Sequence, residues 1–272
     1  MKLFQHTVLW LLPACLLLQS SALMATELLD WPCQRVVVSR SSDQMPPFSF
    51  RDPQHKLTGY RIEFIQQLFA RLGCDLEILT DLPWKRSLML LKEGEVDVLM
   101  NASMSAQRAE FAWFSIPYEQ EQLALFVKAG TQLPIKELQD IVRLGYQVGL
   151  IRGNYYGDTI NSLFQQPDTK SKIVEAIDRQ SLGQLLLRDR VQLYLDYYPN
   201  GVLALQNTAQ QQLIVQHPLP PQQIGQVYFM LSRNSVSPAF VRQLNKELSL
   251  MLQDGSIEKL RQKYALSLQV AG

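Results

Sequence analysis

The feature of this chain that most constrains its fold is a repeated alternation of strand-like and helix-like segments. A β-branched run at residues 36–40 reads as a strand, residues 59–73 carry apolar side chains at helical spacing, and residues 74–80 read as a second strand. The same order recurs later, with strands expected at 96–101, 146–151, 172–176 and 191–196 and helices at 84–93, 158–164 and 181–187. Strand, helix, strand units form right-handed parallel pairs, so the sequence predicts an α/β protein built twice around parallel sheet.

The C-terminal part of the sequence reads as two helices. Ser237 is a good N-cap residue, and Pro238 occupies the first helical position, where a missing N–H costs nothing. The tripeptide Asp254-Gly255-Ser256 ends this helix and begins a second one. These helices extend the alternating pattern to the end of the chain.

Composition fits such a protein and excludes several classes. The chain has 272 residues, of which 47% are hydrophobic and 19% charged, an ordinary globular composition for about two domains. Lys and Arg number 26 against 25 Asp and Glu, and this balance argues against a nucleic-acid binder. Three His and three Cys are too few for a zinc site of the usual kinds, so no metal is expected.

The N-terminal segment has the pattern of an export signal. Lys2 precedes the uncharged apolar run Val8–Leu18, and small residues follow it. The run is too short to cross a bilayer, which takes about 20 residues. We therefore predict that residues 1–25 are a signal peptide cleaved after Ala22 or Ala25, and that the mature protein is exported.

Two cysteines remain after that cleavage, Cys33 and Cys74. An even pair in an oxidising compartment indicates a disulfide, although two separate buried thiols are the alternative. Cys33 precedes the first expected strand and Cys74 opens the second. If these parallel strands are neighbours, both thiols lie at the same edge, where a bridge is geometrically reasonable.

Residues 84–118 carry the most informative motif of the sequence. A helix ending at Gly94 leads to a strand, then to the small-polar turn Ser103-Met104-Ser105-Ala106-Gln107-Arg108, then to the aromatic segment Phe114–Tyr118. A small-polar turn at the end of a parallel strand offers backbone N–H donors to a ligand. Arg108 adds a planar fork that matches a carboxylate. The sequence contains no G-x-S-x-G elbow, P-loop or H-E-x-x-H, so no catalytic residues are assigned.

Five elements in this order resemble a known family. Besides the segment above, they are MPPFSF, GYRIEFIQQLFARLG, VGLIRGNYYGD and the closing LSLMLQDGSIEKLRQKY. Together they resemble the bacterial extracellular solute-binding proteins of family 3, cluster 3, which feed polar amino acid ABC importers from the periplasm. The resemblance covers nearly the whole mature chain.

The resemblance implies a ligand site. In the family, the small-polar turn and its Arg hold the ligand carboxylate, which corresponds here to Arg108 and Ser103, with Ser105 and Asn101 beside them. It further implies an aromatic that stacks on the ligand, contacts from the second lobe and an acid for an α-ammonium, at Trp84, Asn154, Tyr155 and Asp196. For Asp196, the neighbouring Tyr197 is an alternative register.

Two positions depart from the family pattern. An Asp followed three residues later by a Tyr becomes Ser42 and Met45, so Met45 is the candidate contact in that loop. The acid of the G-F-D element is Arg61. Both departures weaken the case for a standard α-amino acid, whereas Arg108 still argues for a carboxylate or another anion.

The resemblance also implies an architecture. It is a two-lobed periplasmic-binding-protein type II fold, each lobe a mostly parallel sheet flanked by helices, joined by a two-crossing hinge. The first lobe comprises residues 27–119 and 227–272, and the second lobe comprises residues 120–226. Closure of the hinge around a ligand is the implied motion.

These observations lead to a functional expectation. We expect a monomeric, non-enzymatic periplasmic receptor that captures an amino acid or related small carboxylate for an ABC permease, without a cofactor. Two alternatives remain open: a dehydratase-like enzyme on the same scaffold acting on a small cyclic carboxylic acid, and a ligand-sensing subunit for a membrane sensor.

Overall fold

The computed structural model describes residues 33, 36–39, 44–198, 200–206, 208–264 and 266. The expected signal peptide, residues 1–25, lies outside these described residues, as do both of its candidate cleavage positions. The residues described from Cys33 onward belong to one compact unit. In this part of the chain no helix is long and apolar enough to cross a membrane.

The expected strands are present in the expected order, and additional strands lie between and after them. They are β1 Val36–Ser39, β2 Gln44–Met45, β3 Ser49–Arg51, β4 Leu57–Thr58, β5 Leu76–Leu79, β6 Val98–Ser103, β7 Ala112–Phe114, β8 Glu119–Lys128, β9 Val148–Ile151, β10 Ile173–Ala176, β11 Leu193–Tyr198, β12 Ile214–Gln216 and β13 Gln222–Ser232.

The helices expected from apolar spacing are present, and short ones connect the strands. They are α1 Tyr60–Arg71, α2 Trp84–Glu93, α3 Ala106–Ala109, α4 Asp140–Arg143, α5 Asp158–Gln165, α6 Pro167–Lys170, α7 Arg179–Leu187, α8 Asn200–Gln206, α9 Pro238–Gln253 and α10 Ser256–Lys263. The N-cap of α9 is Ser237, whose hydroxyl accepts a hydrogen bond from the Phe240 N–H at 3.2 Å. This confirms the cap predicted from the sequence.

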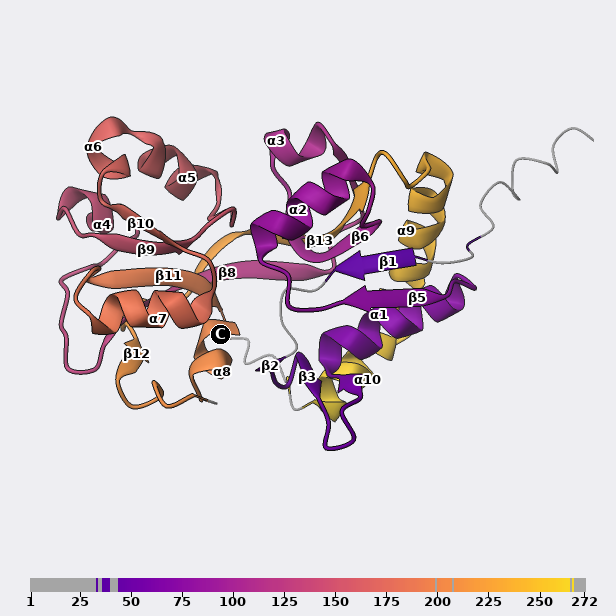
Figure 1. Ribbon diagram of the computed structural model, residues 1–272, viewed down its shortest axis with the longest axis horizontal. Coiled ribbons are helices and arrows are strands. Elements are labelled where there is room, and N and C mark those ends of the chain that lie inside the picture. Colours follow the sequence, from indigo (N-terminus) through magenta and orange to yellow (C-terminus); the bar gives the residue numbers. More distant parts are fainter. Residues whose placement is uncertain are drawn as a thin grey trace, which may run out of the picture. The chain divides into compact units, whose positions relative to one another are not determined.

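One sheet organises the described residues. Its strand order is β10-β9-β11-β8-β13-β6-β1-β5, with β12 paired to β8 and β7 paired to β13. Strands β1, β5 and β6 are parallel to one another in this path, as are β9, β10 and β11. Figure 1 shows β1 beside β5 and β9 beside β10. The parallel units expected from the sequence are therefore present in both parts of the chain.

The two long strands β8 and β13 were not predicted from the alternation pattern. They pair antiparallel with each other, and β8 also pairs antiparallel with β11, while β13 does so with β6. Their first halves carry polar runs, Glu119–Gln122 and Gln222–Gln226, which hide the apolar signature of a central strand. The Pro-rich segment 217–223 ends inside β13.

The Pro-containing segment after β1 has secondary structure of its own. It forms a small three-stranded antiparallel sheet in the order β2-β3-β4. Proline cannot donate to a ladder, so the pairing uses the residues that flank the Pro46-Pro47 pair and not the prolines themselves. This sheet places Met45 and Phe48 in the interior, at 3% and 5% exposure.

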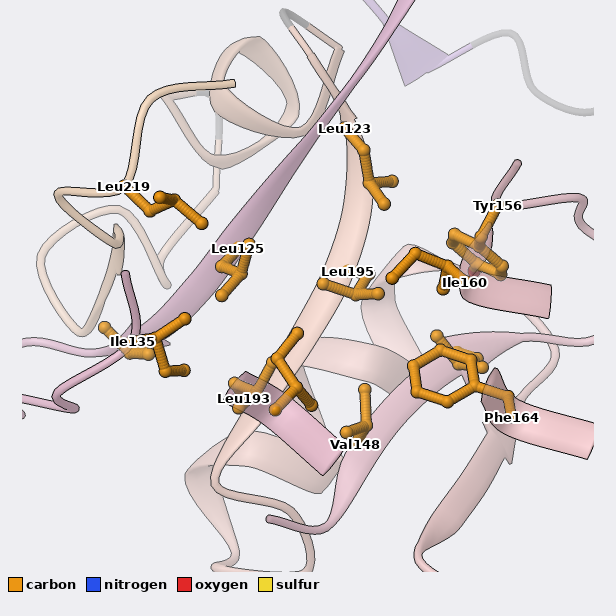
Figure 2. Close-up of a cluster of buried hydrophobic side chains, with 13 residues drawn as sticks. Leu123, Leu125, Ile135, Val148, Tyr156, Ile160, Phe164, Leu193, Leu195 and Leu219 are labelled. Carbon is orange, nitrogen blue, oxygen red and sulfur yellow. The ribbon is translucent and has the colours of Figure 1, made fainter. Parts of the chain in front are cut away.

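The hydrophobic interior is divided into separate clusters. Figure 2 shows one of them, formed by side chains from β8, β9, β11 and the segments around them, including Leu125, Val148, Leu195 and Phe164. Another cluster joins α2, β6, β7 and β13 through residues such as Leu91, Leu99 and Met230. Each cluster buries the apolar faces of its own strands and helices.

A disulfide joins the two halves of the first parallel unit. Strands β1 and β5 are parallel neighbours with Val36 opposite Leu76, and Cys33 and Cys74 just before them are bonded with their Cα atoms 4.9 Å apart. The disulfide expected from the sequence is confirmed, and the alternative of two separate thiols is excluded.

Removing this bond should destabilise the fold measurably. The two cysteines are 41 residues apart, and loop-closure entropy for that separation corresponds to about 4 kcal/mol. We expect a Cys33→Ser/Cys74→Ser variant to lose about that much free energy of unfolding in urea denaturation followed by circular dichroism. An unchanged denaturation midpoint would show that this disulfide does not support the fold.

Candidate functional site

The small-polar turn predicted to bind a ligand follows strand β6 directly. The strand ends at Ser103, and Ser105 caps the short helix α3 by accepting a hydrogen bond from the Arg108 N–H at 3.3 Å. This local geometry fixes the backbone of Arg108 one helical turn after the strand. It also turns the side chain back toward the carboxyl end of β6, where α/β proteins place their ligands.

Arg108 is buried among neutral acceptors. It is 6% exposed, and its Nη1 donates to the Ser103 carbonyl at 2.7 Å while its Nη2 donates to the Gly153 carbonyl at 2.9 Å. Burial lowers the pKa of Arg108, and the nearby Tyr197 and Glu121 act in the opposite direction. Within the part of the chain that the structure describes, Arg108 forms no ion pair. The two Arg108 nitrogens that could bind a carboxylate therefore donate to backbone carbonyl oxygens instead.

Aromatic side chains flank this guanidinium. The Arg108 guanidinium carbon lies 5.5 Å from the ring centre of Trp84 and 5.9 Å from that of Tyr155. Trp84 begins α2 and donates from its indole Nε1 to the Gly153 carbonyl at 3.1 Å. The Gly153 carbonyl thus accepts from Arg108 and Trp84 together. Such arrangements stabilise a cation by about 0.5–2 kcal/mol.

Tyr155 and Asn154 belong to the turn that follows β9. The Tyr155 hydroxyl donates to Asp158 at 2.5 Å, and its carbonyl accepts from the Tyr197 hydroxyl at 2.7 Å. Burial, together with the bond to Asp158, raises the pKa of Tyr155 to about 12. The Asn154 N–H closes the turn on the Ile151 carbonyl at 3.1 Å. Tyr155 therefore reaches Arg108, whereas Asn154 contributes its backbone to the turn.

Ser103 contacts a carboxyl that the sequence did not single out. The Ser103 hydroxyl donates to Glu121 Oε1 at 2.9 Å, and both side chains are buried. Burial raises the pKa of Glu121 to about 7, with the Ser103 hydrogen bond and the Arg108 charge opposing the rise. Glu121 Oε2 is buried without a hydrogen-bond partner among the described residues.

Asn101 adopts a left-handed backbone conformation just before Ser103. Its φ is 55°, a region that asparagine tolerates better than most residues. Its N–H donates to the Tyr118 hydroxyl at 2.9 Å, and its side-chain Oδ1 is buried with no hydrogen-bond partner in the described structure. Tyr118 of the aromatic segment thereby holds the turn that carries Ser103.

Asp196 is placed differently from the expectation of an acid free to bind an ammonium. It is 1% exposed and forms a two-point ion pair with Arg179: Nε bonds to Oδ2, and Nη2 donates to Oδ1 at 3.0 Å. Burial lowers the pKa of Arg179, but the Asp196 carboxylate outweighs it and the net shift is upward. Arg179 Nη1 also lies 3.4 Å from the Met45 sulfur. Asp196 and Met45 thus share one cationic neighbour.

Arg61, the departure from the family pattern, is also buried. It is 5% exposed, stacks over the Phe48 ring at 4.4 Å and donates from Nη2 to the Asn200 side chain at 3.0 Å. Burial lowers the pKa of Arg61, and the nearby Glu119 counteracts the effect. Its Nε is buried with no partner among the described residues.

The structure brings together most of the predicted residues in two groups. Ser103, Ser105, Trp84 and Tyr155 contact Arg108 directly, whereas Met45 and Asp196 meet at Arg179. A pocket lined by Ile141, Tyr146, Phe164 and other residues shares no residue with either group. Among the described residues, no cluster of His, Cys, Asp and Glu could hold a metal ion.

Sequence reasoning missed Glu121, Arg179 and the Gly153 carbonyl. Glu121 had one detectable signal, since it stands in a polar run directly before the apolar segment Leu123–Val127, where strand alternation turns it inward. Arg179 follows Asp178, the N-cap of α7, and nothing local marks it as a partner of Asp196. The role of the Gly153 carbonyl could not be predicted, because every residue has a backbone carbonyl and the sequence does not show which one accepts a side-chain hydrogen bond.

The folded chain has the arrangement of a periplasmic-binding-protein type II fold. An ancestral arginine-binding protein bound to arginine superimposes with a TM-score of 0.69 at 22% identity, covering 85% of this chain and 97% of that one. The model for bacterial extracellular solute-binding proteins, family 3, matches residues 37–267. The chain belongs to this family.

Two curated relatives differ in activity. The L-cystine-binding protein TcyJ of Escherichia coli (strain K12) is 33% identical over 127 residues, which are 46% of this chain and 47% of that protein. The chain thus spans about half the length of this relative. Cyclohexadienyl dehydratase of Pseudomonas aeruginosa is 24% identical over 267 residues, 95% of this chain and 93% of that protein. The family resemblance therefore includes binding proteins and an enzyme.

The buried carboxyl of Glu121 gives folding stability a specific pH dependence. Its pKa in the folded chain, about 7, lies above the ordinary 4.5, so ionisation penalises the folded state. The penalty is absent below about pH 4.5, grows as pH rises to about 7 and then stays constant. A shift of this size corresponds to roughly 3 kcal/mol.

Glu121→Gln should remove that penalty. We expect the free energy of unfolding of the variant, relative to the unmodified protein, to rise by roughly 3 kcal/mol between about pH 4.5 and pH 8. Urea denaturation at several pH values measures it. A difference that stays constant over this range would contradict the assignment of a raised pKa to Glu121.

Removing Arg179, the ion-pair partner of Asp196, should lower the free energy of unfolding. Arg179→Met leaves a carboxylate that is 1% exposed without its counter-charge, and breaking a buried pair in this way costs about 3–5 kcal/mol. We expect a loss of that order in urea denaturation at neutral pH. If the variant is as stable as the unmodified protein, Asp196 does not depend on Arg179 for its burial.

Proposed function

We propose that this protein is a non-enzymatic periplasmic receptor that captures a small carboxylate-bearing solute, an amino acid or related organic acid, for an ABC importer. The observation that carries the proposal is the buried guanidinium of Arg108, which has no counter-ion among the described residues. A buried charge is expensive unless it is paired. An incoming carboxylate would supply that pair.

The surroundings of Arg108 suit such a ligand. Its two bonded donors end on the backbone carbonyls of Ser103 and Gly153, which are neutral acceptors. A carboxylate is the stronger acceptor for a guanidinium, contributing about 1.5–3 kcal/mol per charged hydrogen bond. Trp84 and Tyr155 offer flat surfaces against which the rest of a small ligand can pack.

The two-lobed division belongs to this proposal. In it, residues 27–119 and 227–272 form one lobe and residues 120–226 form the other, with strands β8 and β13 as the crossings. Separate hydrophobic clusters support the division, because one draws on residues between 123 and 219 and another on residues 90–112 with Met230. Trp84 and Arg108 would then bond across the hinge to Gly153.

The L-cystine-binding relative supports an amino acid as the first ligand to test. The motion would be a hinge closure that the ligand favours by contacting both lobes at once. The permease, or a membrane sensor in its place, would recognise the closed form. Export to the periplasm and action as a monomer complete the proposal.

A second candidate function is an enzyme acting on a small cyclic carboxylic acid. One observation favours it: Glu121 is a buried carboxyl whose pKa of about 7 suits general acid catalysis at neutral pH, beside an arginine that could hold a substrate carboxylate. The similarity to cyclohexadienyl dehydratase along most of the chain points the same way. Incubating the purified protein with a carboxylic acid that carries a cyclohexadienyl ring and following its dehydration would decide between turnover and binding.

The receptor proposal is tested by replacing Arg108 with lysine, which keeps the positive charge but lacks the planar guanidinium. A panel of amino acids and small organic acids, including L-cystine and L-arginine, is screened by thermal shift and then by calorimetry. We expect Arg108→Lys to weaken binding of every hit by about 10- to 100-fold, since lysine cannot form the two-point contact.

The matched control is Arg190→Lys, on an exposed residue before β11. It should bind as the unmodified protein does. Arg108→Lys with unchanged affinity for all hits would remove Arg108 from the site.

A further inference from the structure

Glu121 carries a buried oxygen whose purpose the fold does not explain. The residue is 5% exposed, its Oε1 accepts the Ser103 hydroxyl at 2.9 Å, and its Oε2 has no hydrogen-bond partner in the part of the chain that is described. Buried polar atoms in native proteins are nearly always paired, so an unpaired one suggests a missing partner. The oxygen that lacks a partner belongs to the same carboxyl that accepts the hydrogen bond from Ser103 in the predicted small-polar turn.

The groups around Glu121 come from four elements. Ser103 lies on β6, Arg108 on α3, Tyr197 on β11 and Tyr155 on the turn after β9, and the charge of Glu121 acts on all three of the titratable ones. Arg108 is the one cation among them. Glu121 therefore belongs to the same polar cluster as the proposed carboxylate site.

The neighbouring strand places no side chain against Oε2 at position 225. Glu121 on β8 stands opposite Gly225 on β13, and a Cβ added to Gly225 would lie 3.9 Å from Oε2, at ordinary contact distance. Without that side chain, nothing from position 225 covers the oxygen. Glycine at position 225 therefore leaves no β13 side chain between Oε2 and an incoming donor on that side.

The acid expected to receive a ligand cation is already engaged. Asp196 is held by Arg179 through both carboxylate oxygens, and its Oδ1 also accepts the Tyr197 N–H at 2.8 Å. A ligand ammonium would have to compete with the Arg179 guanidinium for Asp196. Glu121 offers an oxygen without such a competitor.

We propose that Glu121 is a further ligand-binding residue, whose Oε2 accepts a hydrogen bond from an ammonium on the ligand that Arg108 holds by its carboxylate. This inference rests on the proposed receptor function and extends it to the ligand's cationic group. Arg108 and Glu121 then form a complementary pair of contacts to a zwitterion, replacing the role that Asp196 was expected to play.

Ligand capture should then release a proton. The buried acid of Glu121 loses its proton to solvent as the ligand ammonium forms a charge-assisted hydrogen bond to the resulting carboxylate. The raised pKa of Glu121, about 7, means that much of this carboxyl is protonated before binding at pH 6. Affinity should therefore increase as pH rises from about 5.5 to about 7.5.

The experiment is calorimetry at about pH 6 in two buffers of different ionisation enthalpy, with L-cystine and L-arginine as probes. The unmodified protein should release close to one proton per ligand bound, and Glu121→Gln should release none. At about pH 8, Glu121→Gln should bind the amino acids at least about tenfold more weakly. Dithiodipropionate and guanidinovalerate, which lack the ammonium, should bind the variant and the unmodified protein alike.

The controls separate this inference from the receptor proposal. Glu95→Gln, on an exposed residue, should leave affinity and proton release unchanged, and thermal midpoints show that each variant is folded. If the unmodified protein binds an amino acid while Glu121→Gln matches its affinity and proton release, only the role of Glu121 is overturned. If the unmodified protein binds no amino acid of the thermal-shift panel, an amino acid receptor is excluded and this inference fails with it.

Discussion

The burial of the Arg108 guanidinium, which forms no ion pair among the described residues, is the constraint on which the proposed site depends. Arg108 lies at the end of β6 because Ser105 caps α3 and fixes the turn, and its donors reach the Ser103 and Gly153 carbonyls. Carbonyl oxygens satisfy the hydrogen bonds but do not neutralise the charge. The cost of burying the uncompensated charge of Arg108 therefore favours the binding of an anion.

The sequence predicted the parts of the fold that rest on local patterns. Apolar spacing located α1, α2 and α9, and the β1–α1–β5 unit followed from its order, so Cys33 and Cys74 could be placed at one edge and are bonded there. Strands β8 and β13 escaped prediction because their polar halves are stabilised by pairing with each other, a contact between segments about a hundred residues apart. Long-range pairing of this kind overrides local propensity.

The contacts among the candidate site residues were predictable to the same extent. Arg108, Ser103 and Ser105 were found because they stand close together in one motif, and Trp84 and Tyr155 do meet that arginine. The ion pair of Asp196 with Arg179 could not be foreseen, since it joins the start of α7 to β11 and no spacing rule links them. A register argument could place Asp196 at the strand end but could not show which cation it meets.

Charge balance connects these departures. Arg61 replaces an acid of the family pattern and is buried, and the partly exposed Arg179 pairs with Asp196, so cations stand where the family resemblance implies anionic groups. Additional positive charge strengthens the hold on a ligand carboxylate but repels a ligand ammonium. A receptor with this set of residues needs a separate acceptor to keep a zwitterionic ligand. Glu121 would meet that need at a low electrostatic cost, because its raised pKa of about 7 keeps the carboxyl largely protonated below neutral pH, so it adds little buried charge there until a cation arrives.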